Sequence, residues 1–119
     1  MRVQRKFRLT RSTDFKRVRR TGKSYAHPFV VLVIQASEMP RVRVGVTAGR
    51  SVGGAVQRNR AKRLLREAMR PLLPDLLPGW DLILIARPAL LPSISLLEIR
   101  QVLTNLLRRA QIVSLSNET

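Results

Sequence analysis

The sequence has no cysteine and few acidic residues. Without cysteine the chain cannot form disulfides, bind a metal ion through thiolates or use a cysteine nucleophile. The acidic residues are scattered singly, at Asp14, Glu38, Glu67, Asp75, Asp81, Glu98 and Glu118. A protein nuclease needs clustered carboxylates for metal ions, or a paired general acid and base. We therefore expect no catalytic residue and no metal site on this chain.

The single histidine and the glycine-rich segment do not change this expectation. A general base at His27 would need an orienting partner that the sequence does not identify, so we interpret His27 as a surface or cleft residue before Pro28. Residues 49–54, Gly-Arg-Ser-Val-Gly-Gly, lack the Gly-Lys-Ser/Thr ending of a nucleotide-binding P-loop. Nucleotide binding of the enzymatic kind is not expected.

Long apolar runs are also missing. No segment approaches the roughly 18 consecutive apolar residues of a membrane-spanning helix. The best candidate, residues 80–97, is interrupted by Asp81, Arg87, Pro88 and Pro92. The basic N-terminus is not followed by an uncharged apolar segment, as a secretory signal requires. It has a faint similarity to an organellar transit peptide, but the residues from Phe15 onward already fit a folded domain. We expect a cytoplasmic protein without a membrane partner.

Positive charge is abundant. Lysine and arginine number 23 against 7 acidic residues, which gives a formal net charge of +16 and a pI near 12.0. The hydrophobic fraction of 45% is nevertheless ordinary for a folded domain. Such an excess of charge disfavours a compact state unless a polyanion offsets it. The composition therefore predicts a polyanionic partner.

The first half of the chain predicts a helix followed by strands. Residues 12–22 suit a short helix, in which Ser12 caps the amino end and Gly22 takes the left-handed conformation that often closes a helix. Residues 29–36 are a valine-rich run of strand length, and residues 41–46 alternate between valine and other residues, as a half-buried strand does. The short connection predicts that the two strands form an antiparallel hairpin.

Residues 55–70 are the most informative segment. At about 100° per residue they form a helix with one apolar side, which carries Ala61, Leu64, Leu65, Ala68, Met69 and Leu72. The opposite side is cationic and carries Asn59, Lys62, Arg63, Arg66 and Arg70. Pro71 and Pro74 end the helix. Because Glu67 is the only acid in the segment, this surface is not self-neutralised, and its guanidinium groups suit phosphate oxygens.

The rest of the chain predicts a buried strand at residues 80–86 and a last helix that begins near Ser95. Ser95 and Glu98 have the spacing of a capping box. The apolar stripe of this helix contains Leu96, Ile99, Leu103, Leu106, Leu107 and Ala110. No repeat or linker divides the chain. We therefore expect one α+β domain over residues 1–119, with helices on a small sheet, a core over about residues 7–111 and a polar C-terminal tail from Ser114.

These segments together resemble the protein subunit of bacterial ribonuclease P. The hallmark of that family is an Arg-Asn-Arg motif in a basic helix. Here the motif occupies residues 58–60, within Val-Gly-Gly-Ala-Val-Gln-Arg-Asn-Arg-Ala-Lys-Arg-Leu-Leu-Arg-Glu-Ala at residues 52–68. Further similarity extends over residues 8–9, 14–22, 43–47, 79–81 and 85–88 and over the last helix, so that only the termini lie outside it.

The resemblance implies a two-layer αβββαβα sandwich with a left-handed βαβ crossover. It also implies a ribonucleoprotein endonuclease that removes the 5′ leader of precursor tRNA, in which the RNA subunit holds the catalytic Mg²⁺ ions. The protein would bind no cofactor of its own and need no further protein partner. The residues implied to contact the catalytic RNA are Arg58, Asn59, Arg60, Lys62, Arg63 and Arg66. Those implied to form a leader-binding cleft are Phe15, Val18, Arg19, Phe29, Val31 and Arg50.

Two positions depart from the family pattern. A basic pair is reduced to Arg50 followed by Ser51, and Arg19 replaces the second aromatic of the first helix.

The residues alone leave other functions open. A ribosomal protein or another RNA-binding factor would explain the charge and the size equally well. Only the order of the motifs distinguishes these alternatives from the ribonuclease P family. A DNA-binding protein could use residues 55–70 as its recognition helix, but this sequence shows no clear helix-turn-helix companion before them. A nuclease with a hidden site would cut RNA unaided.

Overall fold

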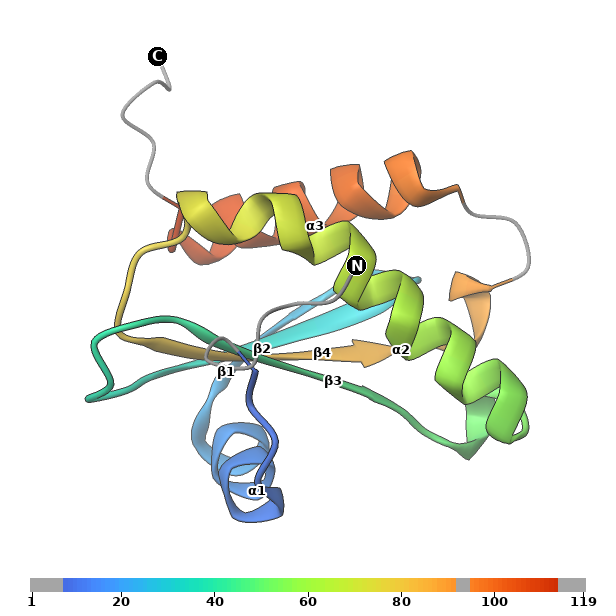
Figure 1. The fold of residues 1–119 in the computed structure, drawn as a ribbon, viewed down its shortest axis with the longest axis horizontal. Coiled ribbons are helices and arrows are strands. Elements are labelled where there is room, and N and C mark those ends of the chain that lie inside the picture. The colour runs from blue at the N-terminus through green and yellow to red at the C-terminus, as the bar shows by residue number, and fades with distance from the viewer. Residues whose placement is uncertain (1–7, 92–94, 114–119) are drawn as a thin grey trace.

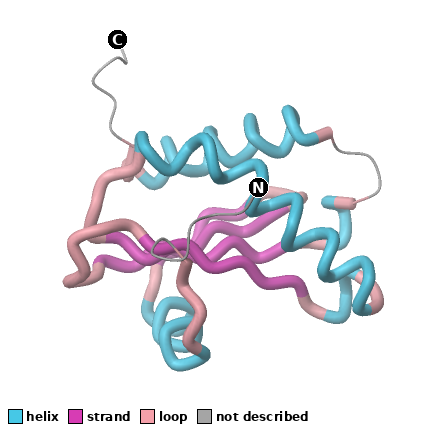
Figure 2. The backbone as a smooth tube through the Cα atoms, in the orientation of Figure 1, coloured by secondary structure: helices cyan, strands magenta, loops and turns pink. Residues whose placement is uncertain are grey.

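The described residues, 8–91 and 95–113, alternate between helices and strands in a computed structural model of the chain (Figures 1 and 2). The elements are α1 (Ser12–Thr21), β1 (Lys23–Ala26), β2 (Val30–Ala36), β3 (Arg43–Ala48), α2 (Ala55–Met69), β4 (Trp80–Ala86) and α3 (Leu96–Ala110). This is the αβββαβα order that the resemblance implies, and it confirms the α+β class. The residue pattern alone did not predict β1, which is short and mostly exposed.

The four strands form one sheet in the order β1-β2-β4-β3. Strand β4 pairs antiparallel with β2 and parallel with β3. The predicted hairpin between β2 and β3 is therefore wrong, because β4 lies between them. Strand β4 takes the central place because it is apolar on both faces, and Leu82, Ile83 and Leu84 are fully buried. Alternation shows which face of a strand is buried, but it does not identify the neighbouring strand.

Helix α2 makes the crossover between the parallel strands β3 and β4. Its path over the sheet, which can be followed in Figure 1, is left-handed. Nearly all such crossovers in proteins are right-handed, so this unit is a distinctive feature of the fold. The parallel pairing also explains the length of the connection, because a tight turn can join only antiparallel strands.

Helices lie on both faces of the sheet (Figure 1). Helices α2 and α3 cover one face, and the larger core lies between them and the sheet, built from residues such as Leu32, Leu65, Leu84 and Leu103. Helix α1 packs on the opposite face over a smaller cluster of Leu9, Val18, Val33 and Ile83. The sandwich of the sheet with α2 and α3 is thus completed by α1 on the other side.

The ends of α1 differ from the prediction. Ser12 is the first helical residue rather than the cap, because Arg11 precedes the helix and no side chain caps its amino end. Gly22 has an extended conformation with a φ of −79°, so it is not a left-handed residue. Glycine is required there by space: a Cβ would lie 2.4 Å from the carbonyl oxygen of Val18 and 2.6 Å from that of Ile34. Gly22 therefore lets α1 turn directly into the sheet.

The other predicted helix ends agree with the structure. Helix α2 ends at Met69 and continues as a 3-10 helix over Arg70–Asp75, as its two prolines predict. Helix α3 begins with the predicted capping box, in which the Glu98 amide donates to Ser95 Oγ at 3.1 Å and the Ser95 amide donates to Glu98 Oε1 at 3.2 Å. Leu96 is exposed rather than part of the buried stripe. The tail from Ser114 lies outside the described residues.

Candidate RNA-binding surfaces

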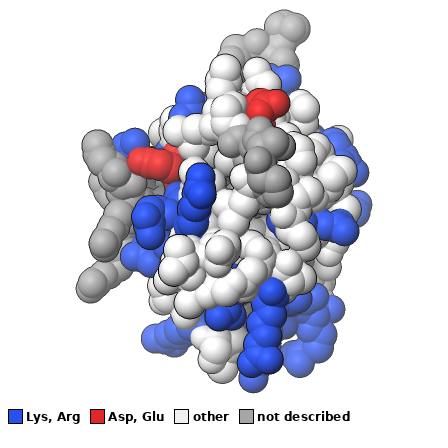
Figure 3. All heavy atoms as spheres, turned by 90° about the vertical axis from the view of Figure 1, so that its right-hand side faces the viewer, with Lys and Arg blue, Asp and Glu red and all other residues white. Residues whose placement is uncertain are grey.

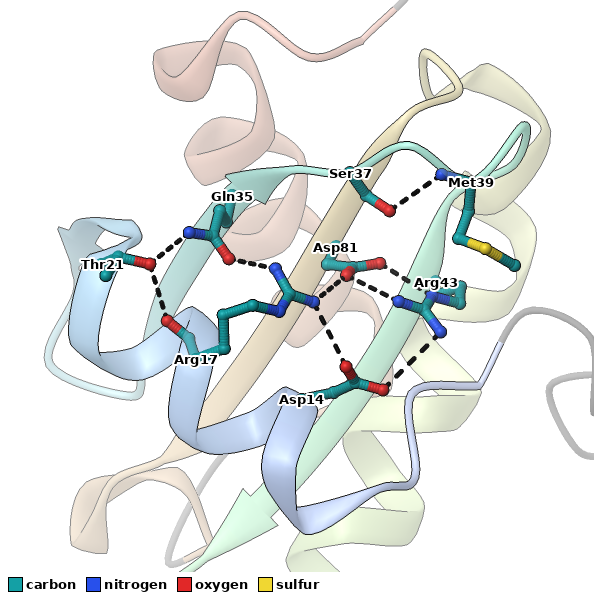
Figure 4. A network of polar contacts seen from close by, with 8 residues as sticks. All are labelled: Asp14, Arg17, Thr21, Gln35, Ser37, Met39, Arg43 and Asp81. Atoms are coloured by element: carbon teal, nitrogen blue, oxygen red, sulfur yellow. Dashed lines mark hydrogen bonds and ion pairs between the residues drawn. The ribbon is translucent and has the colours of Figure 1, made fainter.

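A buried carboxylate joins α1 to the sheet (Figure 4). Asp81 at the start of β4 has no exposed surface. Arg43 of β3 donates to both of its oxygens, from Nε at 2.9 Å and from a terminal nitrogen at 2.8 Å, and Arg17 of α1 donates to Oδ2 at 2.5 Å. Two guanidinium groups thus neutralise and hydrogen-bond one carboxylate, as a buried charge requires.

Further polar contacts extend this network along α1. Asp14 lies 3.5 Å from Arg17 and 3.7 Å from Arg43, and Gln35 of β2 accepts from Arg17 and donates to Thr21. The hydrogen bond to Asp81 raises the pKa of Arg43 against the opposing effect of burial. Because folding raises this pKa, the positive charge contributes to stability at any pH below the ordinary pKa of arginine. This contribution is lost only when the pH rises above that value. Arg43 is therefore charged at neutral pH, where its hydrogen bonds to Asp81 stabilise the fold.

The position of α1 leaves half of this sheet face open. The strand register places Ala26, Val31, Ile85 and Thr47 in one row across β1, β2, β4 and β3. The neighbouring row, which contains Val33 and Ile83, is buried under α1. Val31, Ile85 and Thr47 are only half-buried and Ala26 is exposed, so this row is the part of the face that stays accessible beside α1. We call these four residues the open row.

The structure brings some of the predicted cleft residues together and separates others. Phe15 and Val31 join the cluster on the α1 face, and Arg19 and Arg50 are exposed. Val18 belongs to the same cluster but is fully buried, so it can shape the cleft without touching a ligand. Phe29 packs beside the larger core with its ring 4.9 Å from that of His27, and it is not part of the open row.

The cationic side of α2 faces away from the sheet. Asn59, Arg60 and Arg63 are exposed, and Arg58, Lys62 and Arg66 are half-buried. The apolar side is the predicted one, since Ala61, Leu65, Ala68 and Met69 are buried. Just before the helix begins, Gly53 has a φ of 144°, a backbone conformation that residues with a side chain rarely adopt. Figure 3 shows Lys and Arg at several places on the visible face of the molecule, whereas Asp and Glu occupy small areas of it.

A hollow of about 200 Å³ connects the α2 surface with the region of α1. Arg66 of α2, Phe15 of α1 and Arg8 line it, together with residues of the outer strand β3. The ring of Phe15 lies over Gly45, where a Cβ would be only 2.4 Å from Cζ. Glycine at position 45 thus makes room for the aromatic ring, and the two groups of predicted site residues meet at this edge of the sheet.

Sequence reasoning missed the residues that position the site. Asp81 was one of several scattered acids, and nothing in its neighbourhood indicated that it binds Arg17 and Arg43. Ile85 and Thr47 were not assigned to the cleft because their place beside Val31 depends on the strand order. The only available signal was the period of two along each strand, which gives the face but not the row.

The remaining chemistry of the described residues is structural. His27 Nδ1 accepts a hydrogen bond from the amide of Phe29 at 3.1 Å, which fixes the turn before β2. Within residues 8–91 and 95–113, no three His, Asp or Glu side chains lie together as a metal ion would require. None of the helices in these residues has the length and apolar character of a membrane span.

Comparison with known proteins identifies the family. The sequence model of the family Ribonuclease P matches residues 3–111. This chain belongs to the ribonuclease P protein family. The ribonuclease P protein component of Herpetosiphon aurantiacus is 41% identical over 110 residues, 92% of this chain and 89% of that protein. That of Chloroflexus aurantiacus is 37% identical over 118 residues, 98% of this chain and 87% of the relative.

Solved structures agree with this result. The RNase P protein of Thermotoga maritima superposes with a TM-score of 0.77 at 30% identity and covers 86% of this chain and 96% of its own. A mutant RNase P protein of Staphylococcus aureus superposes with a TM-score of 0.79 at 28% identity, with 90% of each chain covered. The prediction of a ribonuclease P protein, a partner of the RNA in an endoribonuclease that matures tRNA 5′ ends, is confirmed.

Replacing Asp81 by asparagine tests the network that holds α1. The change keeps the shape but removes the charge that two guanidinium groups surround. We expect the free energy of unfolding to fall by about 2–4 kcal/mol, less than for a fully buried pair because both arginines are partly hydrated. Urea unfolding measures the change, with the exposed Asp75→Asn as the matched control. Equal stability of the two variants would contradict a net contribution of the network.

Proposed function

We propose that this ribonuclease P protein holds the catalytic RNA with the cationic side of α2 and the 5′ leader of precursor tRNA in the cleft over the open row. The proposal is based on the presence of two chemically different surfaces in two parts of one fold. One is a helix face rich in guanidinium groups, and the other is a half-covered apolar sheet face. Each surface suits a different form of RNA.

The α2 surface suits the phosphate backbone of a folded RNA. Arg58, Arg60 and Arg63 lie within two turns of one helix, and in the described chain none of the three has a carboxylate within ion-pair distance. Guanidinium forks bind phosphate oxygens in pairs, and Asn59 adds a neutral donor and acceptor. Because the apolar side of α2 is packed in the core, these side chains are displayed from a rigid support.

The cleft suits an unpaired strand. Its floor is apolar through Val31 and Ile85, and Phe15 packs in the same cluster, so unpaired bases can pack against it. The exposed Arg19 and Arg50 add charge for the backbone, and Arg87, which follows β4, is also exposed. The leader of precursor tRNA is such a strand. Replacement of the family's aromatic by Arg19 shifts the balance from stacking toward charge.

The cleavage chemistry belongs to the RNA in this proposal. Magnesium ions held by the catalytic RNA would supply the reaction, and the protein would supply affinity for RNA and for the leader. The scattered carboxylates and the structural hydrogen bond of His27 support this division. The cytoplasm, where tRNA precursors are processed in bacteria, is the compartment that fits this role.

Charge reversal of Arg58, Arg60 and Arg63 to glutamate should abolish tight binding to the catalytic RNA without unfolding the domain. The reason is that phosphate contacts dominate such affinities, and each lost contact also lowers the salt slope by about 0.7–0.9. Filter binding at several salt concentrations measures both effects. The control reverses the exposed Arg11, Lys16 and Arg20 instead. If the α2 variant bound like the control, the α2 surface would not be the RNA contact.

Replacing Val31 and Ile85 by serine should weaken binding of precursor tRNA to the holoenzyme while leaving mature tRNA unaffected. The leader would lose apolar contact with two aliphatic side chains, and since full burial of such a side chain is worth about 1.5–3 kcal/mol, partial loss at both should weaken binding roughly tenfold. The half-buried Val102→Ser in α3 is the control for loss of an apolar group. An equal loss for precursor and mature tRNA would show that the cleft does not bind the leader.

Replacing His27 by alanine, or one carboxylate by its amide, should leave the cleavage step intact if the domain stays folded. A general acid or base contributes about 10²- to 10⁴-fold, so a catalytic group on the protein would be evident. Single-turnover cleavage with saturating holoenzyme separates this step from binding. A hundredfold loss, with RNA affinity and thermal unfolding unchanged, would mean that the protein takes part in the chemistry.

A further inference from the structure

A second cluster of cations lies at the edge of the sheet opposite β3. Lys23 and Tyr25 belong to the edge strand β1, and Arg109 belongs to the last turn of α3. The Lys23 Nζ is 5.6 Å from the centre of the Tyr25 ring, and the Arg109 Cζ is 5.8 Å from it. Arg109 also donates to the carbonyl oxygen of Ala26 at 3.3 Å. One aromatic ring thus gathers two cations from segments far apart in the sequence.

This arrangement leaves positive charge unbalanced. In the described chain, neither Lys23 nor Arg109 has a carboxylate within ion-pair distance; Asp14, Asp81 and Glu67 form their ion pairs with Arg17, Arg43 and Arg70. Contact with a ring contributes only about 0.5–1 kcal/mol per exposed cation. The helix dipole favours Arg109 at the end of α3, but it does not account for Lys23. Both side chains are exposed, so an anion from solution can approach both of them.

The cluster is separate from the two surfaces already described. Tyr25 is paired with Leu32 of the larger core, so it points toward the side of the sheet that α2 and α3 cover, and Lys23 points to the same side. The open row faces the other way. A ligand at Lys23 and Arg109 therefore approaches from the helical layer, to which α2 also belongs, and not from the leader cleft (Figure 1).

We propose that Lys23, Tyr25 and Arg109 form a third RNA contact, which binds a backbone phosphate of the catalytic RNA. Lys23 and Arg109 bind the phosphate oxygens, and Tyr25 is a positioning residue that holds both cations at the edge of the sheet. The proposal rests on the proposed function, because it assumes that the catalytic RNA covers the side of α2. It adds a contact at the far end of the same layer.

The test compares two double variants of the full chain in binding to the catalytic RNA transcript. Lys23→Gln with Arg109→Gln removes both cations of the cluster. Lys16→Gln with Arg108→Gln removes an exposed lysine of α1 and the arginine next to Arg109 in α3. We expect the first variant to bind roughly tenfold more weakly, because each exposed ion contact with phosphate contributes about threefold. Its salt slope should be lower by about 0.7–0.9 for each lost contact, and the control should keep the wild-type slope.

Tyr25 gives an independent measurement. Tyr25→Phe keeps the ring and should bind like the wild type, whereas Tyr25→Leu removes the ring and should lose most of the affinity that the double variant loses. Combining Tyr25→Leu with the double variant should add little, because all three residues act on one phosphate. Full additivity of these losses would overturn the assignment of Tyr25.

The outcomes separate this proposal from the proposed function. If the Arg58, Arg60 and Arg63 variant loses RNA binding while the Lys23 and Arg109 variant keeps wild-type affinity and slope, the third contact alone is refuted. If the wild type does not bind the transcript, the proposed function fails first. A loss of affinity for precursor tRNA without a loss for the catalytic RNA would overturn the choice of partner.

Discussion

A carboxylate without access to water is stable only where cations and hydrogen-bond donors surround it. Asp81 meets this condition through Arg43 on the next strand and Arg17 on α1, so three segments that are distant in the sequence are joined at one point. Because this point lies at one end of the sheet, α1 covers that end and leaves the other uncovered. The open row thus depends on an interaction that contains none of its own residues.

Two populations of cations can be distinguished among the residues that the structure describes. Arg17, Arg43 and Arg70 are paired with acids and serve the fold. The cations of α2 and of the β1 edge are displayed on secondary structure whose other side is packed. This division fits a compact domain with a net charge of +16: the buried acid, Asp81, is neutralised by two arginines, and the excess of positive charge is placed where a polyanion can reach it.

The sequence predicts α2 well because its apolar period and its charge occur on the same helix and need no partner to be recognised. The capping box of α3 is predicted for the same reason, since it is local. The order of the strands is not local. Alternation in β3 identifies Val44 as buried, yet it says nothing of β4 as the neighbour, and so the hairpin and the place of Ile85 were missed. Asp81 was missed because a single acid carries no pattern, and its partners lie 38 and 64 residues away.

The central position of β4 has a consequence for how the chain is made. Strands β2 and β3 precede it in the sequence but contact each other only through it, so synthesis leaves both without a neighbour on that side until residue 86 has been added. Until then, only the short β1–β2 hairpin can form, and isolated hairpins are marginal in water. The cationic α2 is therefore synthesised before the sheet that will support it, and the nascent chain exposes two strand edges at once. A chain that ended before Trp80 would lack the strand that joins the two halves of the sheet, together with the carboxylate that fastens α1.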